Sequence, residues 1–163
     1  MADVSEKLVE YVQDAHAMEQ NVLRMLDSMI STTEDPHIKA ELEHHRTETQ
    51  RHEERLRNRL DELGKGTSPI KQAGLVAGAM VKGMVDQLRG DKPGRNARDG
   101  YVTEHMEIAA YELLERMAKR AGDSKTAEIA RANCNDEREM ASKIEANWDK
   151  FVELTLSEEG VAA

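Results

Sequence analysis

The sequence predicts an all-α protein, a ferritin-like antiparallel four-helix bundle made of two helical hairpins joined by one long crossover connection that contains a short helix. Three observations predict this fold. Apolar residues recur at helical spacing along most of the 163 residues, strand-like alternation is absent, and the three prolines lie beside turn-forming residues. Because short connections make antiparallel neighbours of the helices that they join, we expect the first two helices and the last two helices to form hairpins.

Each expected helix has recognisable start or stop signals, and all of them lie in a single domain, residues 1–163. Ser5 is the expected N-cap of the first helix, and Gly64 ends the second. Gly122 ends the third, and Asp123 or Ser124 caps the fourth. The expected helices cover residues 5–30, 36–63, 97–121 and 124–156, with the crossover at 64–96.

The crossover differs in composition from the helices because it holds most of the glycines. Its apolar middle, residues 70–88, is expected to form a short connector helix in which small residues allow close packing. The apolar side of this segment is also the expected contact of a homodimer. A membrane surface is the alternative partner, but the segment lacks the strength of a membrane anchor.

Composition and charge exclude several classes of protein. The 23 basic and 32 acidic residues give a net charge of −9, which argues against a nucleic-acid partner. The longest apolar stretch, residues 73–81, has nine residues, whereas roughly 20 are needed to span a bilayer. The single cysteine excludes disulfides within the chain and zinc sites of paired cysteines. With no basic region at its amino terminus, the chain is expected to be cytoplasmic, with no membrane partner.

Each of the four expected helices directs at least one glutamate toward its apolar face. The faces follow from a rotation of about 100° per residue, on which Glu48 flanks its apolar face by about one sixth of a turn. The second helix adds two histidines near the centre of the same face. The candidate ligands are Glu19, His45, Glu48, His52, Glu104, Glu107 and Glu137.

Several carboxylates in one core predict a pair of divalent metal ions. Burying an unpaired carboxylate costs several kcal/mol, and several carboxylates together also repel one another. Two shared divalent ions remove both costs. Glutamate oxygens with one or two imidazoles suit iron first, with manganese or zinc as alternatives, whereas the histidines disfavour calcium. Di-metal carboxylate bundles place glutamates and Glu-x-x-His pairs inward in this way.

A simpler explanation exists for each residue alone. A single glutamate on an apolar face usually lies at the edge of a bundle with its carboxylate in water. His45 or His52 would then only cap the core through a hydrogen bond. His44 faces solvent by helical phase, His105 lies off its apolar face, and His16 carries no signal. The coincidence of one inward glutamate on every helix favours the metal centre.

Short motifs on each expected helix carry a family resemblance. They are Asp14 with Met18-Glu19, His45-x-x-Glu48-Thr49, Glu54-Arg55-Leu56, Glu104-His105-x-Glu107-Ile108-Ala109-x-Tyr111, and Asp136-Glu137 ahead of Ala141 and Ile144. The motif around Glu104 is the most specific. Through these motifs the chain resembles the YciE/YciF family of ferritin-like proteins over residues 6–150, most weakly in the glycine-rich crossover.

This resemblance implies a ferritin-like four-helix bundle with a di-metal centre, commonly linked to bacterial stress responses. By similarity to ferritin-like centres, Glu19 would be a terminal ligand, and Glu48 and Glu137 would each bridge the two ions. Glu104 and Glu107 form a Glu-x-x-Glu pair that looks like the third helix of rubrerythrins.

Two departures from that pattern affect the ligand set. Ferritins and rubrerythrins have a histidine three residues after the ligand glutamates of their second and fourth helices, where this chain has Arg51 and Met140. Met140 is a poor ligand for a hard divalent ion. His45 or His52 would replace the missing histidine on the second helix, so the two ions are expected to be bound weakly or asymmetrically.

The expected function is redox chemistry on dioxygen or peroxide, of a ferroxidase or peroxidase type. No cofactor beyond the two divalent ions is expected, and Tyr111 is the tyrosine nearest to them by helical phase. Two alternatives stay open: a protein that binds divalent metal without turnover, and a structural stress-response bundle in which the carboxylates and histidines form a metal-free network. The sequence assigns no catalytic residue.

Overall fold

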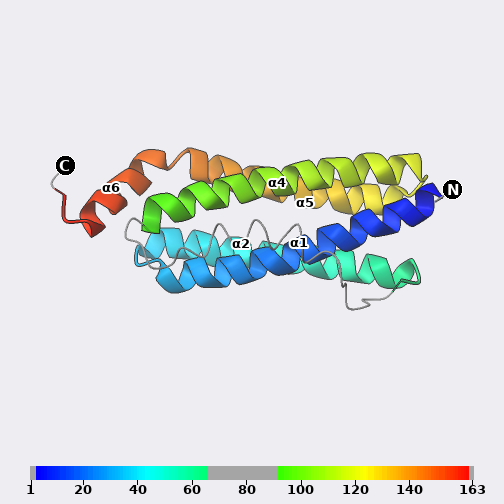
Figure 1. Ribbon diagram of the computed structural model, residues 1–163, viewed down its shortest axis with the longest axis horizontal. Helices are drawn as coiled ribbons and strands as arrows, with labels where there is room; N and C mark the ends of the chain where they lie inside the picture. Colours follow the sequence, from blue (N-terminus) through cyan, green and yellow to red (C-terminus); the bar gives the residue numbers. More distant parts are fainter. Residues whose placement is uncertain (1–2, 66–91, 162–163) are drawn as a thin grey trace.

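The structure is a computed structural model that describes residues 3–65 and 92–161. The helices are α1 Val4–Thr32, α2 Pro36–Glu62, α4 Lys92–Arg120, α5 Ser124–Glu145 and α6 Trp148–Glu158 (Figure 1). These described residues contain no strand, which confirms the predicted all-α class. The expected connector helix and dimer contact at residues 70–88 lie outside the described residues.

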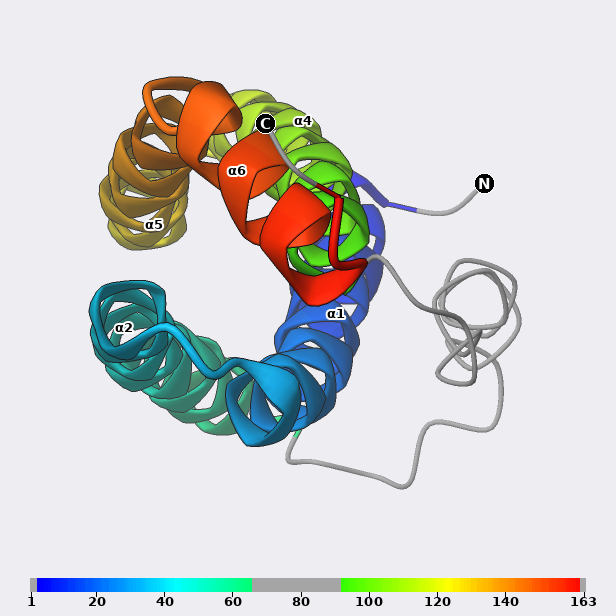
Figure 2. The ribbon, with the colours of Figure 1, turned by 90° about the vertical axis from the view of Figure 1, so that its left-hand side faces the viewer.

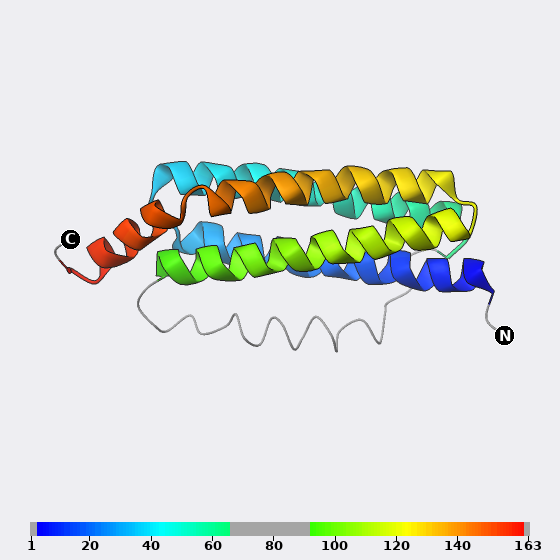
Figure 3. The same cartoon turned by 90° about the horizontal axis from the view of Figure 1, so that it is seen from above.

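The four long helices form a bundle in which packed neighbours run antiparallel. α1 packs against α2 and α4 against α5, while α1 also contacts α4 and α2 contacts α5. Figures 1 and 3 show that each of these pairs runs in opposite directions, and Figure 2 shows the four helices around one axis. α6 packs against α4 at one end of the bundle (Figure 2). The predicted arrangement of two hairpins is therefore present.

Capping residues explain where the hairpins turn. Asp35 accepts hydrogen bonds from the backbone N–H groups of His37 (3.0 Å) and Ile38 (2.9 Å) at the start of α2. Gly64 follows the end of α2 with a positive φ of 69°, a conformation that glycine adopts without steric cost. Asp123 caps α5 through the Thr126 N–H at 3.0 Å. Arg59 donates to Asp123 at 2.7 Å and so joins the end of α2 to the start of α5.

Two helix starts differ from the expected ones. The N-cap of α1 is Asp3, and Ser5 lies inside the helix. α4 begins at Lys92, several residues before the expected start at 97. Pro93 does not prevent this because the first turn of a helix needs no intrahelical N–H donor. Gly94 donates its N–H instead to Thr155 Oγ1 on α6 at 3.0 Å.

The predicted fourth helix, 124–156, is two helices that meet at residues 146–147. In a continuous helix the Lys143 carbonyl would accept a hydrogen bond from the Asn147 N–H. Here the Asn147 side-chain amide donates to that carbonyl at 2.7 Å, and the Asn147 N–H donates to the Ile144 carbonyl at 3.0 Å. An asparagine that competes for the backbone in this way ends a helix. α6 therefore leaves the line of α5.

Two apolar clusters fill the bundle on either side of a polar layer. One contains Leu8, Leu56 and Leu114, and the other contains Leu26 and Ile144. On each long helix the buried glutamates and histidines come between these two sets in the sequence. No helix among the described residues is both long and apolar enough to cross a membrane. The polar layer lies inside the protein and needs a separate explanation.

Candidate metal centre

Six acidic and imidazole side chains meet in the polar layer. Each is at most 1% exposed, and they come from all four long helices: Glu19, His45, His52, Glu104, Glu107 and Glu137. They form two groups that could each hold an ion, with ligand atoms within 4.8 Å of one another in each group. Glu137 belongs to both groups. A shared carboxylate between two such groups is the arrangement of a bridged pair of ions.

The first group combines His45 with three glutamates. His45 Nε2 lies 3.3 Å from Glu104 Oε1 and 3.5 Å from Glu137 Oε2. Glu107 completes this group from the next turn of α4. One imidazole nitrogen and three carboxylates therefore face a common point.

The second group is smaller and contains Glu19, His52 and Glu137. His52 Nδ1 lies 2.8 Å from Glu137 Oε1 and 3.6 Å from Glu19 Oε1. Despite these distances, neither His52 Nδ1 nor Glu137 Oε1 has a partner in hydrogen-bond geometry. The two atoms converge without being aligned toward each other, as ligands of one ion do.

The hydrogen-bond inventory tests whether a metal fits these residues. Nine buried side-chain nitrogen and oxygen atoms in the described part of the chain lack a hydrogen-bond partner, and eight of them belong to the six residues of the two groups. Both oxygens of Glu107 and both of Glu137 are among them. Buried polar atoms without partners are rare because each costs about 1–3 kcal/mol. Their concentration at one point fits a set of ligands for divalent ions.

The electrostatics of the layer also indicate missing positive charge. Burial and the charges of neighbouring glutamates raise the pKa of Glu107 well above its ordinary value. Burial raises the pKa of Glu104 to about 7, against the opposing effect of His45. For His52, burial would lower the pKa, but the adjacent carboxylates of Glu137 and Glu19 raise it to about 10. Protons therefore supply part of the charge that cations would supply.

Each histidine in the layer has a carboxylate on its outer ring nitrogen. His52 Nε2 donates to Asp136 Oδ2 at 3.0 Å, which leaves Nδ1 directed toward Glu19 and Glu137. His45 Nδ1 donates to Glu48 Oε2 at 3.4 Å, which leaves Nε2 directed toward the first group. A carboxylate on the outer nitrogen orients a ligand histidine and keeps its inner nitrogen available for a metal.

We expect Asp136→Asn and Glu48→Gln each to weaken the affinity for one ion by about 10–100-fold, the usual cost of losing a carboxylate behind a ligand histidine. Asp136→Asn would affect the ion at His52, and Glu48→Gln the ion at His45. Competitive titration against a chromophoric chelator measures both affinities. Glu139→Gln, at an exposed position of α5, is the matched control. Affinities equal to those of the control would contradict the assignment.

A hydrogen-bonded chain connects the second group with the surface. Tyr111 donates its hydroxyl hydrogen to Glu19 Oε1 and accepts a hydrogen bond from Asn133 Nδ2 at 3.0 Å. Arg55, which is partly exposed, donates to Asn133 Oδ1 at 2.7 Å. Burial and the charge of Glu19 raise the pKa of Tyr111 well above its usual value. The phenol therefore stays protonated and holds Glu19 in position.

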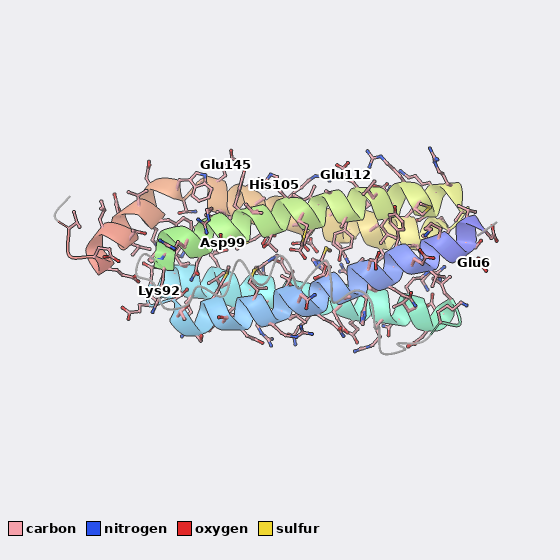
Figure 4. The ribbon with its side chains drawn as sticks, in the orientation of Figure 1. Glu6, Lys92, Asp99, His105, Glu112 and Glu145 are labelled. Carbon is pink, nitrogen blue, oxygen red and sulfur yellow. The ribbon has the colours of Figure 1, made fainter. Side chains whose placement is uncertain are left out.

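Of the seven ligand candidates, the structure brings six together, and Glu48 lies outside both groups. Its side chain is 18% exposed and lies between the imidazoles of His44 (3.3 Å) and His45 (3.4 Å). The bridging role that the family resemblance implied for Glu48 stays a prediction. His105 lies on the exposed side of α4, as its phase predicted (Figure 4).

The structure adds polar residues for which the sequence held weak signals. Asp136 contacts His52 of the layer although it is rotated by about 100° from Glu137, and Asn133, one turn before Glu137, contacts Tyr111. His16, which carried no signal, is buried, and its Nε2 donates to Glu53 Oε1 at 2.8 Å. Asp136 had one indirect signal, since a buried ligand histidine needs a partner for its second nitrogen.

The metal-free protein is expected to lose stability as pH rises from about 5 to 9. The pKa of Glu104 rises from 4.5 to about 7 on folding, and that of His52 rises from 6.5 to about 10. At a pH between the unfolded-state pKa and the folded-state pKa of a group, the folded protein binds more protons than the unfolded protein. The free energy of unfolding therefore falls as the pH rises through that range. Thermal melts in the presence of a chelator measure this dependence. A melting temperature that rises over this range would contradict the charge assignment.

Comparisons with known proteins agree with this geometry. Residues 3–157 match the family model described as domain of unknown function DUF892. A Xanthomonas campestris pv. campestris protein of known crystal structure is 29% identical, with a TM-score of 0.81 over 98% of this chain and 100% of that chain. The E. coli stress protein YciF is 16% identical, with a TM-score of 0.78 over 94% of this chain and 99% of that chain.

A third solved structure bears on the metal question. It belongs to ferritin-like, diiron-carboxylate proteins from Bacillus anthracis str. Ames, with 14% identity and a TM-score of 0.73 over 91% of this chain and 99% of that chain. At this identity the likeness shows the fold. Together the comparisons confirm the predicted resemblance to the YciE/YciF family and the ferritin-like bundle.

Proposed function

This chain belongs to the family of the domain of unknown function DUF892, and we propose that it binds two divalent metal ions and uses them in redox chemistry on dioxygen or peroxide. Iron is the expected metal, with manganese or zinc as alternatives. The observation that carries the proposal is the buried layer of four glutamates and two histidines whose inward atoms lack partners. The buried His/Glu groups and the fold both fit a di-metal protein.

The two groups suggest which residues would hold each ion. The first group, with His45 and three glutamates, offers more ligands than the second, with His52, Glu19 and Glu137. Four carboxylates carry four negative charges, which two divalent ions would neutralise while both histidines stay neutral. Carboxylate oxygens with single imidazoles suit iron or manganese more than sulfur-seeking metals. Because the fourth helix has no ligand histidine, the two ions are expected to bind asymmetrically, and the protein would then have unequal affinities for them.

A pair of ferrous ions would supply the two electrons that the reduction of a peroxide requires. The residues of the chain would exclude bulk water from the layer and hold the ligands in place. Asp136 would keep the proton of His52 on Nε2. Tyr111 would keep its own proton on Oη and donate a hydrogen bond to Glu19. The described structure assigns no catalytic residue beyond these positioning roles.

Anaerobic loading followed by mixing with hydrogen peroxide tests the redox step. The protein loaded with ferrous ion is expected to oxidise two ferrous ions for each peroxide consumed, faster than free ferrous ion does. A protein that binds ferrous ion without accelerating its oxidation would support the alternative of a non-catalytic metal-binding protein. A protein that binds no metal would support the metal-free structural bundle.

We also propose a cytoplasmic homodimer, and a role in stress responses, of which only the stress role is implied by the family resemblance. The expected dimer contact at residues 70–88 lies outside the described residues. A monomeric mass by light scattering at micromolar concentration would contradict the dimer.

A further inference from the structure

A cavity of about 350 Å³ extends from the α6 end of the bundle to the metal-binding layer. Phe151 and Leu154 of α6 line its outer part, and Leu26 of α1 lines its wall. On α4 and α5 the lining residues nearest to the layer are Glu104 and Met140. Glu104 is 1% exposed and its Oε2 has no hydrogen-bond partner. The inner end of the cavity is therefore a residue of the first group itself.

The lining of the cavity excludes most kinds of occupant. Its wall is largely aliphatic and aromatic, so a hydrated metal ion would lose its water there without gaining ligands. Besides Glu104, the lining contains four acidic residues and one lysine, Lys143: the acidic residues are Glu34, Asp35, Glu41 and Glu158. Lys143 is already paired with Glu41 at 3.5 Å and with Glu139 at 3.2 Å. An anionic ligand would meet net negative charge. The cavity suits an uncharged, mainly aliphatic molecule.

The volume indicates how large a molecule the cavity can enclose. At about 30 Å³ for each water-sized group, 350 Å³ accommodates up to roughly a dozen non-hydrogen atoms. A medium-chain alkyl hydroperoxide with roughly ten such atoms is uncharged and fits within this limit. Its peroxide group is also the reactant that the proposed redox function requires.

We infer that this cavity binds a medium-chain alkyl hydroperoxide as the organic substrate of the metal centre. The inference rests on the proposed function. In the reaction the O–O bond breaks, two ferrous ions give one electron each and become ferric, and two protons are taken up, so that R–OOH yields R–OH and water. The alkyl chain lies among the apolar residues, with the peroxide group at the Glu104 end.

Binding is tested first with 1-octanol, which resembles the alcohol product. Trp148 is the single tryptophan of the chain, and its ring lies 6.2 Å from that of Phe151 in the cavity wall. Its fluorescence is expected to change on adding 1-octanol, with or without metal. Octanoate is expected to bind at least about tenfold more weakly because its charge would be buried among acidic residues.

Ala97→Leu tests the location of the ligand because Ala97 is buried and lines the cavity. The larger side chain is expected to weaken 1-octanol binding about tenfold or more by occupying the space. Ala109→Leu, at an exposed position of the same helix, is the matched control. Leu154→Glu, at a half-buried position of α6, is a second cavity variant should Ala97→Leu fold poorly.

Single-turnover oxidation of the ferrous-loaded protein tests the substrate class. Octyl hydroperoxide and hydrogen peroxide are compared, and the ratio of the two rates is expected to fall about tenfold in Ala97→Leu relative to Ala109→Leu. Reaction with neither peroxide would contradict the proposed function, while 1-octanol binding would still report the cavity. An unchanged ratio, or no 1-octanol binding, would overturn the inference alone. If the protein binds no 1-octanol and its dimer dissociates in Ala97→Leu, the occupant of the cavity is a second copy of the chain. That result would also overturn the inference.

Discussion

Glu137→Ala is expected to remove both metal ions in one step. Glu137 is the residue that the two groups share, with one oxygen 3.5 Å from His45 Nε2 and the other 2.8 Å from His52 Nδ1. Glu19→Ala, which affects the second group only, is expected to remove one ion and leave the other. Metal content per chain after loading and desalting, measured by elemental analysis, separates these outcomes.

Two further variants make that result interpretable. Glu137→Gln keeps the volume of the side chain and removes its charge, so a folded Glu137→Gln variant without metal would attribute the loss to the carboxylate. Glu139→Ala removes an exposed glutamate from the same helix and is expected to retain both ions. Retention of one full equivalent by Glu137→Ala would contradict the shared position of this residue.

Metal loading is expected to raise the melting temperature of the wild-type protein by roughly 10–20 °C. A ligand that binds only the folded state stabilises it by about 2.7 kcal/mol for each site at a concentration of 100 Kd, or about 5 kcal/mol for two sites. For a chain of this size about 1 kcal/mol corresponds to roughly 2–4 °C. The gain is large because the ions neutralise buried carboxylates that otherwise repel one another and lack partners.

The same measurement on Glu137→Ala is the control, and we expect almost no gain there. The gain in the wild-type protein is expected to increase from pH 5 to pH 8, since metal ions displace the protons that Glu104 and His52 retain in the metal-free state. A wild-type melting temperature that does not respond to ferrous, manganous or zinc ions would contradict the stabilisation.

Helical phase predicts much of the candidate site. Glu19, Glu104 and Glu137 fall on apolar faces, and the structure buries all three. A carboxylate among apolar neighbours is visible in a sequence because one rotation of about 100° per residue determines the face. His45 and His52, left as alternatives by the sequence, are both in the layer, one in each group.

Contacts between helices are harder to predict than faces. Glu48 and Asp136 lie beside the inward face, and the rotation and axial position of one helix against the next decide what each meets. Glu48 meets the outer nitrogen of His45, and Asp136 meets that of His52 from a different helix. A single sequence contains no direct record of these relative positions.

The break between α5 and α6 has a local cause that the apolar periodicity of the sequence does not indicate. Apolar residues continue at helical spacing through Trp148 and Phe151, so the pattern predicts one helix. The side chain of Asn147 competes with its own backbone for the Lys143 carbonyl. Asparagine allows this but does not require it, so its position within a periodic segment was an insufficient signal.

The most direct test of the metal centre is the metal-to-protein ratio of the wild-type chain. Purified protein is loaded anaerobically with ferrous ion, desalted and measured by elemental analysis beside the Glu139→Ala control. Close to two ions per chain, bound with unequal affinities, is the result that the paired groups around Glu137 predict. No stoichiometric metal in the folded protein would contradict the centre and leave the buried glutamates and histidines as a metal-free polar core.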